Sequence, residues 1–400
     1  MHRRTLQALM LGAMLAGCAA NPAIGQATPP FTLTTLASFD QPFAMAFLPE
    51  GAVLVTEKPG HLRYWKQGQA TLDITSVPLS KLIDQGGLLD VALSPGFATD
   101  RRIYLTYSSS VAQTGTGLTL ATATLPLDRP RLQGVKVLFK DIQGGKGGQF
   151  GARIAFAPDG KTLFLTSGER QRFTPAQDLN QPLGKILHLN LDGTPAADNP
   201  GAGQLGSHVV VITNPPEDTY AATTATGRRW GYPKPNLTPA QTWTTGHRNP
   251  YGLAFDADGR LWETEMGPKG GDELNLIERG KNYGWPAVSE GNNYNGKPIA
   301  RPATRSEFTA AKLFWVPSIS PGGLMIYQGS RFPQWKGDAF LPALSGQALI
   351  RVHLAGDIAT KADQWPMGFR VRYVQQDAAG NIYLLEDGSP GRLIRLDPKP

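Results

Sequence analysis

The sequence contains one cysteine in 400 residues, Cys18. An intrachain disulfide is therefore excluded, and the hydrophobic core alone must hold the fold together. Long apolar runs are also scarce. The N-terminal "MHRRTLQALMLGAMLAGCAA" has two arginines followed by an apolar run too short to span a bilayer, which predicts an export signal rather than a membrane helix.

The position of Cys18 indicates how this signal ends. Cys18 follows "LAG", which is similar to the lipobox of bacterial lipoproteins, so we expect a signal peptide over residues 1–17 and a lipidated Cys18. Ordinary cleavage after "AIGQA" (23–27) is the alternative. In the first case residues 18–30 form a flexible tether, and the protein is a periplasmic one held at the outer membrane by its lipid.

Several catalytic and binding motifs are missing as well. There are six histidines and no G-x-S-x-G, CxxC or HExxH, so a serine, thiol or zinc hydrolase has no support. No G-x-G-x-x-G opens a βαβ unit, so a nicotinamide cofactor lacks its usual site. The net charge of +7 falls to +5 without Arg3 and Arg4, and the lysines and arginines form no basic run. Nucleic-acid binding is therefore not expected, while a pocket for an acidic small molecule is compatible.

What the sequence does contain is a repeated phrase. The 46 glycines and 33 prolines suit many short strands joined by tight turns. A Pro/Asp/Gly turn between two apolar, alternating segments recurs along the chain and predicts hairpins. The copies are "AFLPEGAVLVTEKPG" (46–60), "ALSPGFATDRRIYLTYS" (92–108), "AFAPDGKTLFLTSGER" (155–170), "AFDADGRLWETEMGP" (254–268), "QQDAAGNIYLLEDG" (375–388) and a weaker one within 325–354.

Six copies predict an all-β fold, a six-bladed β-propeller with extended loops that forms one domain over residues 31–400. Each unit has roughly 60 residues, somewhat more than common propeller blades need, so the blades carry extra loops. Segment 194–242, rich in Pro, Thr and Gly, is expected to be a long inserted loop. A pair of β-sandwiches is the alternative, but it does not require the recurring turn.

Candidate site residues gather in glycine-rich turns. "GHRNPYG" (246–252) offers the guanidinium of Arg248 and the amide of Asn249, which suit a ligand with carbonyl or hydroxyl groups or serve the turn itself. "DQGGLLDVAL" (84–93) places Gln85 at a strand entry. "FRVRYV" (369–374) directs Arg370 and Arg372 to one side of a strand, where they require carboxylates as partners.

A further turn suits a metal ion. In "GPKGGDELNL" (267–276), backbone carbonyls of Gly267 and Pro268 come close to Asp272 and Glu273. Such hard oxygens are the ligands that Ca²⁺ prefers. A glycine-rich turn with a solvated acidic pair is the alternative.

Taken in order, these segments resemble the soluble quinoprotein family of aldose sugar and glucose dehydrogenases, which are six-bladed and depend on pyrroloquinoline quinone (PQQ). The phrases that carry the resemblance span residues 31–398 and are "QPFAMAFLPEG", "QGGLLDVALSPGFATDRRIYLTYS", "GARIAFAPDG", "AQDLNQPLGKIL", "GHRNPYGLAFD", "EMGPKGGDELNLI", "KNYGWP" and "RVRYV".

The resemblance implies a cofactor and two metal ions. PQQ would be bound by Gln85, Arg248, Asn249, Arg370 and Arg372. One Ca²⁺, held partly by the carbonyls of Gly267 and Pro268, would polarise the quinone, and a second, structural Ca²⁺ would use Glu273 and the region of Tyr283. The expected substrate is an aldose or related alcohol, and electrons would pass to a cytochrome or quinone.

The resemblance also identifies a departure at the expected catalytic positions, Gln149 and Arg248. Relatives carry a histidine base where this chain has Gln149 in "GGKGGQFGARIAF" (144–156), and glutamine cannot take up a proton. Asp84, Glu263 and Glu265 are the substitute bases that the sequence suggests. A second departure is Ser345, where some relatives carry a lysine. The alternatives are a sugar- or protein-binding propeller without turnover, motivated by Gln149, and a Ca²⁺-dependent lactonase or esterase propeller, which matches less well.

Overall fold

The computed structural model describes residues 28–111, 115–126, 128, 130–145, 147–216, 218–232 and 235–399. The expected signal peptide and Cys18 lie outside these residues.

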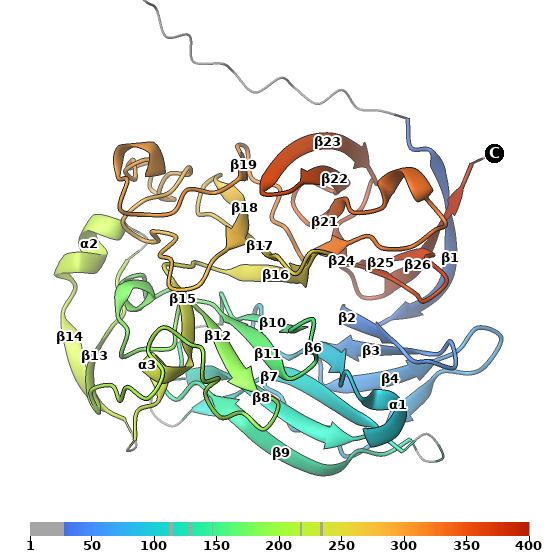
Figure 1. The fold of residues 1–400 in the computed structure, drawn as a ribbon, viewed down its shortest axis with the longest axis horizontal. Helices are drawn as coiled ribbons and strands as arrows, with labels where there is room; N and C mark the ends of the chain where they lie inside the picture. The colour runs from blue at the N-terminus through green and yellow to red at the C-terminus, as the bar shows by residue number, and fades with distance from the viewer. Residues whose placement is uncertain are drawn as a thin grey trace, which may run out of the picture.

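Six four-stranded antiparallel sheets stand around a central axis (Figure 1). The predicted six-bladed β-propeller is therefore confirmed. Each sheet is called a blade here and is numbered along the chain from the first innermost strand. The strands of blades 1 to 3, from the axis outward, are β2 (Pro42–Phe47), β3 (Val53–Glu57), β4 (His61–Trp65) and β5 (Leu72–Ile74); β6 (Leu88–Leu93), β7 (Arg102–Val111), β8 (Gly115–Thr124) and β9 (Gln133–Lys140); and β10 (Gly151–Phe156), β11 (Thr162–Ser167), β12 (Lys185–Asn190) and β15 (Thr242–Thr245).

Blades 4 and 5 repeat this order, and blade 6 takes its outermost strand from the start of the chain. Their strands are β16 (Pro250–Phe255), β17 (Leu261–Glu265), β18 (Asp272–Ile277) and β19 (Leu313–Trp315); β20 (Met325–Ile326), β21 (Ala339–Ala343), β22 (Ala348–Ala355) and β23 (Ile358–Pro366); and β24 (Val371–Gln376), β25 (Ile382–Glu386), β26 (Gly391–Pro398) and β1 (Phe31–Phe39).

The pairing of β1 with β26 closes the ring. It runs from Phe31 opposite Pro398 to Phe39 opposite Gly391, so the first and last strands of the chain share one sheet. Closure of this kind removes the free edges that an open row of blades would have.

The repeated phrases fall where the first two strands of each blade meet. Segment 155–170, for example, covers the turn between β10 and β11, and 375–388 covers the turn between β24 and β25. The weaker copy within 325–354 lies in blade 5. Each copy therefore corresponds to one blade, as the repeat predicts.

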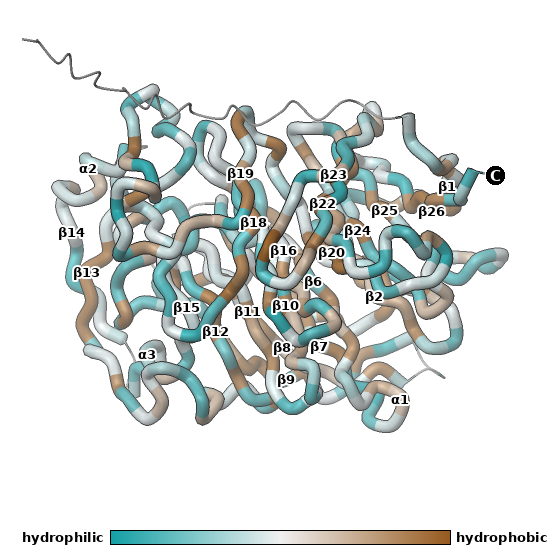
Figure 2. The backbone as a smooth tube through the Cα atoms, turned by 45° about the horizontal axis from the view of Figure 1, so that its top comes forward, coloured by the Kyte–Doolittle hydropathy of each residue, from teal (hydrophilic) through white to brown (hydrophobic). Residues whose placement is uncertain are grey.

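The core is divided among the interfaces between neighbouring blades. Five of the six main clusters of buried hydrophobic residues each join two adjacent blades. The remaining cluster lies mainly between blades 2 and 3 and also includes Phe43 and Ala44 of blade 1 and Tyr251 of blade 4. Alternation along β3 shows how this arises: Leu54 packs toward blade 2, whereas Val53 and Val55 pack toward blade 6. Side chains of a strand alternate between its two faces, and here both faces are covered. Figure 2 shows the hydrophobic residues along the strands and the hydrophilic ones mainly in the loops.

The short helices lie in connections between strands. They are α1 (Phe97–Asp100), α2 (Thr219–Thr224), α3 (Thr238–Gln241), η1 (Thr174–Gln177), η2 (Pro302–Thr304) and η3 (Pro333–Trp335). Segment 194–242 is inserted between the third and fourth strands of blade 3. It is more ordered than a simple loop, because β13 (Val209–Thr213) and β14 (Gly227–Gly231) form a hairpin at the periphery (Figure 1).

Arg153, on β10, connects the blades at the axis. Its guanidinium bonds to Asp90 on β6 at 3.1 Å and to the carbonyls of Tyr251 at 2.7 Å and Gly322 at 2.6 Å. It also lies 4.6 Å from the ring centroid of Phe43 and 4.5 Å from that of Tyr373. One buried side chain thus contacts residues of the other five blades.

Arg153→Leu is expected to lower the free energy of unfolding by about 3–5 kcal/mol, because it leaves the Asp90 carboxylate buried without its partner. Chemical denaturation measures this change. Arg305→Leu removes a surface arginine paired with Glu307 and should cost less than about 1 kcal/mol. The double variant Asp90→Leu, Arg153→Leu should regain part of the loss, and equal losses in the two single arginine variants would contradict a central role for Arg153.

Candidate functional site

An open cavity of about 570 Å³ lies where the innermost strands begin. Blades 1, 2, 4, 5 and 6 all contribute to its wall. It is lined by Gln41, Phe43, Lys58, Asp84, Gln85, Tyr251, Met266, Ser320, Leu344, Arg370, Arg372, Asp387, Gly388 and Ser389. The cavity thus brings together three of the residues predicted for cofactor binding: Gln85, Arg370 and Arg372.

The two arginines share one carboxylate. Arg370 Nε lies 2.7 Å from one oxygen of Asp387, and Arg372 Nη2 lies 2.6 Å from the other. Burial alone would raise the pKa of Asp387, but the charge of Arg372 and the hydrogen bonds from both arginines outweigh it and lower the pKa. The predicted anionic partner of the arginine pair is therefore supplied by the protein itself.

Lys58 adds a third cation to the cavity wall. Its Nζ donates to the backbone carbonyl of Asp84 at 2.6 Å. Burial lowers the pKa of Lys58, and the neighbouring positive charge of Arg372 lowers it further. Ser345, the second departure noted in the sequence, forms a hydrogen bond with the hydroxyl of Ser320 at 2.8 Å. Lys58 is thus the lysine that lines this cavity, although no sequence motif pointed to it.

Gln85 connects the cavity to the loop that carries Gln149. Its side-chain oxygen accepts from the backbone N–H of Gln149 at 2.8 Å and from the Tyr251 hydroxyl at 3.0 Å, and its own N–H donates to the carbonyl of Gly147. The Gln149 side-chain oxygen accepts from the N–H of Gln171 at 3.2 Å. Gln149 therefore lies just beyond the cavity wall and takes part in a hydrogen-bond network.

The glycines before Gln149 allow protein side chains to approach the loop. A Cβ at Gly147 would lie 2.6 Å from the Cβ of Asp84, and one at Gly145 would lie 2.8 Å from the Cβ of Arg170. The neighbours that require glycine here are the side chains of Asp84 and Arg170.

Gln149 itself lines a second, smaller cavity of about 50 Å³. Two further predicted site residues, Arg248 and Pro268, share its wall. The aromatic rings of Phe173 and Trp285 stack there at 5.4 Å. The predicted residues therefore divide between neighbouring cavities.

Buried contacts position the loop that carries His247, Arg248 and Asn249. The N–H of Arg248 donates to Glu265, and its Nη1 donates to the carbonyls of Met266 at 2.9 Å and Gly267 at 2.6 Å. Asn249 accepts from the N–H of Gly151 at 3.3 Å. The side chain of Asn249 is thus used within the protein and does not line the large cavity.

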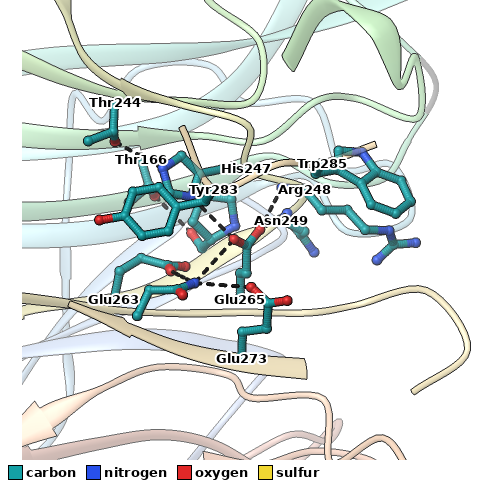
Figure 3. A network of polar contacts seen from close by, with 12 residues as sticks. Thr166, Thr244, His247, Arg248, Asn249, Glu263, Glu265, Glu273, Tyr283 and Trp285 are labelled. Atoms are coloured by element: carbon teal, nitrogen blue, oxygen red, sulfur yellow. Dashed lines mark hydrogen bonds and ion pairs between the residues drawn. The ribbon is translucent and has the colours of Figure 1, made fainter. Parts of the chain in front are cut away.

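An acidic cluster lies directly beneath this loop (Figure 3). Glu263 and Glu265 on β17 face Asn275 and Glu273 on β18 in the strand register, and the Asn275 amide donates to all three carboxylates. Burial and the charge of Glu265 raise the pKa of Glu263 and also that of Glu273. Buried carboxylates at such spacing require protonation or a cation to offset their repulsion.

His247 completes the cluster. Its Nδ1 lies 3.2 Å from Glu265, and its Nε2 lies 2.9 Å from the Thr244 hydroxyl. The ring stacks on Tyr283 at 4.9 Å. One ligand atom each from His247, Glu263 and Glu265 lies within 4.8 Å of the others. The role of Glu263 and Glu265 as substitute bases has no geometric support, because both belong to this buried cluster.

Three of the four predicted metal ligands, Gly267, Glu273 and Tyr283, line one small cavity of about 10 Å³ together with Glu265. The Tyr283 hydroxyl donates to the carbonyl of Leu276 at 2.6 Å, so it is already engaged. Glu265 and its partners on β18 were missed as one group. Their spacing two residues apart was the available signal, but the strand register was needed to place them opposite each other.

Among the described residues, no helix is long and apolar enough to cross a membrane.

The structure is thus a six-bladed propeller with an open cavity whose wall presents two arginines, a lysine and a glutamine. The family model for glucose/sorbosone dehydrogenases matches residues 39–214 and 233–395, so the chain belongs to this family of oxidoreductases. The family expected from the sequence is thereby confirmed.

Individual relatives support the same family membership. An aldose sugar dehydrogenase of Escherichia coli is 33% identical over 375 residues, which cover 90% of this chain and 91% of that one. The crystal structure of the soluble E. coli aldose sugar dehydrogenase in its apo-form has a TM-score of 0.79 and 32% identity over 92% of this chain and all of that chain. A PQQ-bound aldose sugar dehydrogenase from Streptomyces coelicolor shares the fold, with a TM-score of 0.70 and 24% identity over 94% of this chain and 99% of that chain.

Gly147→Ala tests the packing of the glycine loop. The added Cβ would meet Asp84, and we expect an overpacking cost of about 1–3 kcal/mol in the free energy of unfolding. Gly231→Ala is the control, because a Cβ there meets nothing within 4 Å and the φ angle needs no glycine. Thermal melting compares the two variants, and a Gly147→Ala melting temperature no lower than that of Gly231→Ala would contradict the tight contact.

Proposed function

We propose that the protein oxidises an aldose sugar or a related alcohol at its anomeric carbon, with PQQ as the hydride acceptor and Ca²⁺ as a second cofactor. The observation that carries this proposal is the open cavity whose wall presents Arg370, Arg372 and Lys58. Membership of the sugar dehydrogenase family supports the reaction class. The PQQ-bound Streptomyces relative supports the choice of cofactor.

The cavity fits PQQ in size and charge. Its volume of about 570 Å³ is within the range of small-molecule sites. PQQ is a flat quinone with three carboxylates, and the guanidiniums of Arg370 and Arg372 are suited to bind such groups. Arg370 is 46% exposed on its side chain and can turn from Asp387 to a ligand. Gln85 and Lys58 add a neutral and a charged donor to the same cavity wall.

Calcium fits the acidic cluster better than the exposed cavity wall. Glu265, Glu273 and the backbone of Gly267 surround a space large enough for one small ion. One oxygen of Glu263 and the side-chain oxygen of Asn275 are buried without a hydrogen-bond partner among the described residues. Carboxylate, amide and carbonyl oxygens together are a donor set typical of Ca²⁺. The Gly267 carbonyl also accepts from Arg248, so an ion here would connect to the loop beside Gln149.

Bound PQQ would supply a quinone that accepts a hydride, and Ca²⁺ would increase its electrophilicity. The protein's own residues bind and orient the reactants. Arg370 and Arg372 hold carboxylates, Gln85 fixes the loop of Gln149, and Glu265 fixes the loop of Arg248. Gln149 can donate a hydrogen bond to a sugar hydroxyl, but another group must remove the proton.

Titration with PQQ in the presence of Ca²⁺ tests the cofactor. The protein is expected to bind PQQ and to reduce it when an aldose is added, as followed by the absorbance of the quinone. Arg372→Leu should weaken binding about tenfold or more, in line with the loss of a charge-assisted hydrogen bond of about 1.5–3 kcal/mol. Arg395→Leu is the control, because Arg395 pairs with Asp397 on the same strand, β26, away from the cavity wall.

Three outcomes separate the hypotheses. Binding followed by aldose-dependent reduction supports a dehydrogenase. Binding without reduction by any aldose supports the propeller that binds a ligand without turnover. Failure to bind PQQ in the presence of Ca²⁺ contradicts the proposal.

Calcium binding is tested by removal of the ion. A chelator is expected to lower the melting temperature, because a ligand bound only by the folded state stabilises it by about 2.7 kcal/mol at one hundred times its dissociation constant. Glu273→Gln should reduce this Ca²⁺-dependent shift. Glu278→Gln changes an exposed carboxylate five residues away and should leave it intact. A chelator effect that is the same in both variants would place the ion elsewhere.

We also propose that the protein is exported and is anchored through a lipid on Cys18, and that a cytochrome or quinone reoxidises its cofactor. The N-terminal signal pattern supports the first part. The second part follows from the need of any such oxidoreductase for an electron acceptor.

A further inference from the structure

The large cavity contains two carboxylates among its described lining residues, Asp84 and Asp387. Asp387 is held by Arg370 and Arg372, which donate to both of its oxygens. Its lowered pKa makes it a poor proton acceptor. Within the described part of the chain, the Asp84 carboxylate has no hydrogen bond or ion pair. It is thus the carboxylate that is free to act on a ligand in the cavity.

The backbone around Asp84 directs this side chain. Asp84 has a φ of 47°, in the left-handed region, which is uncommon for a residue other than glycine. Its carbonyl accepts from Lys58 Nζ at 2.6 Å, and the next N–H, of Gln85, donates to the carbonyl of Gly147 at 3.0 Å. Such a strained conformation persists only where the surroundings hold it, and it is characteristic of functional positions.

Asp84 lies beside the loop that carries Gln149. Its Oδ2 lies 3.4 Å from the point where a Cβ of Gly147 would stand. Gln85, the next residue, accepts from the N–H of Gln149 at 2.8 Å. The Asp84 carboxylate therefore lies in the large cavity beside the loop that carries Gln149.

The other carboxylates near the site are less suitable. Glu263 and Glu265 are buried in the cluster of blade 4. Glu169 is fully buried, and one of its oxygens accepts from the N–H groups of Arg172 and Phe173. A base must exchange its proton with water after each turnover, and of these carboxylates Asp84 is the exposed one.

Three cations, one tyrosine and one carboxylate lie around Asp84. Lys58 and Tyr251 interact electrostatically with it, and Arg372, Arg370 and Asp387 complete the cavity wall. The three cations exceed the one neighbouring carboxylate. Positive charge therefore predominates on the cavity wall around the Asp84 carboxylate.

We propose that Asp84 is the general base of the reaction, in place of the histidine that Gln149 replaces. This inference rests on the proposed function. The Asp84 carboxylate takes the proton of the anomeric hydroxyl as its O–H bond breaks and the C=O bond forms. The anomeric C–H bond breaks at the same time, and its hydride passes to the quinone, so the sugar is oxidised to a lactone and the quinone is reduced by two electrons. Asp84 then releases its proton to water.

The test compares Asp84→Asn with wild type, both loaded with PQQ and Ca²⁺. The rate of quinone reduction by an aldose should fall about 10²–10⁴-fold, which is the usual contribution of a general base. The PQQ dissociation constant, measured by absorbance titration, should be unchanged or lower, because the variant loses a negative charge beside an anionic cofactor. Asp357→Asn, at an exposed carboxylate between β22 and β23, is the control.

A second variant introduces a histidine base at position 149. Asp84→Asn, Gln149→His should recover most of the lost rate. The pH below which its rate falls should lie near the ordinary histidine pKa of about 6.5, whereas that of wild type should lie lower, nearer the range of a carboxylate. This shift of the pH profile is not expected of a residue with a merely structural role.

Two results would overturn the inference. If Asp84→Asn reduces the quinone as fast as wild type, the base is another group, while the proposed function stands. If neither wild type nor Gln149→His reduces bound PQQ with any aldose, the proposed function fails and Asp84 has no such reaction to serve.

Discussion

The buried ion pair of Arg153 and Asp90 is the contact on which the centre of the molecule depends. A propeller leaves a channel along its axis, and polar backbone groups of the innermost strands face into it. Arg153 satisfies two of these carbonyls, and Asp90 accepts the N–H of Ile154. Burial raises the pKa of Asp90, while the charge of Arg153 opposes this change. The two charges compensate each other because several hydrogen bonds surround them.

The residues of the site are held in place by the innermost strands that Arg153 and Asp90 connect. Each blade contributes a connection of a few residues, and these connections are fixed to one another by side chains such as Gln85 and Glu265. Gln85 links blades 2, 3 and 4, and Glu265 holds the backbone before β16. Groups that are held in place before a ligand arrives lose little freedom on binding, and this pre-organisation is what oriented catalysis requires.

The charges of the site are arranged in two layers. Cations face the open cavity, whereas carboxylates lie buried beneath the loop of Arg248. Arg248 stands between the layers, and its Nε is buried without a hydrogen-bond partner among the described residues. An anionic ligand above and a cation below would therefore each meet groups of opposite charge. The family relationship gives this arrangement a reaction class.

The sequence by itself determined the architecture and selected several of the residues that line the large cavity. Six copies of one hairpin phrase predicted six blades, because local turn chemistry and alternation are properties of short segments. Gln85, Arg370 and Arg372 could be selected because they stand at strand entries. Only the tertiary structure decided which of these residues share a cavity. The contact of Asp84 with Gly147, the register of Glu265 opposite Glu273 and the position of Lys58 all join residues of separate strands or blades. Such contacts depend on how the sheets pack and pair, and no local pattern in the chain encodes them.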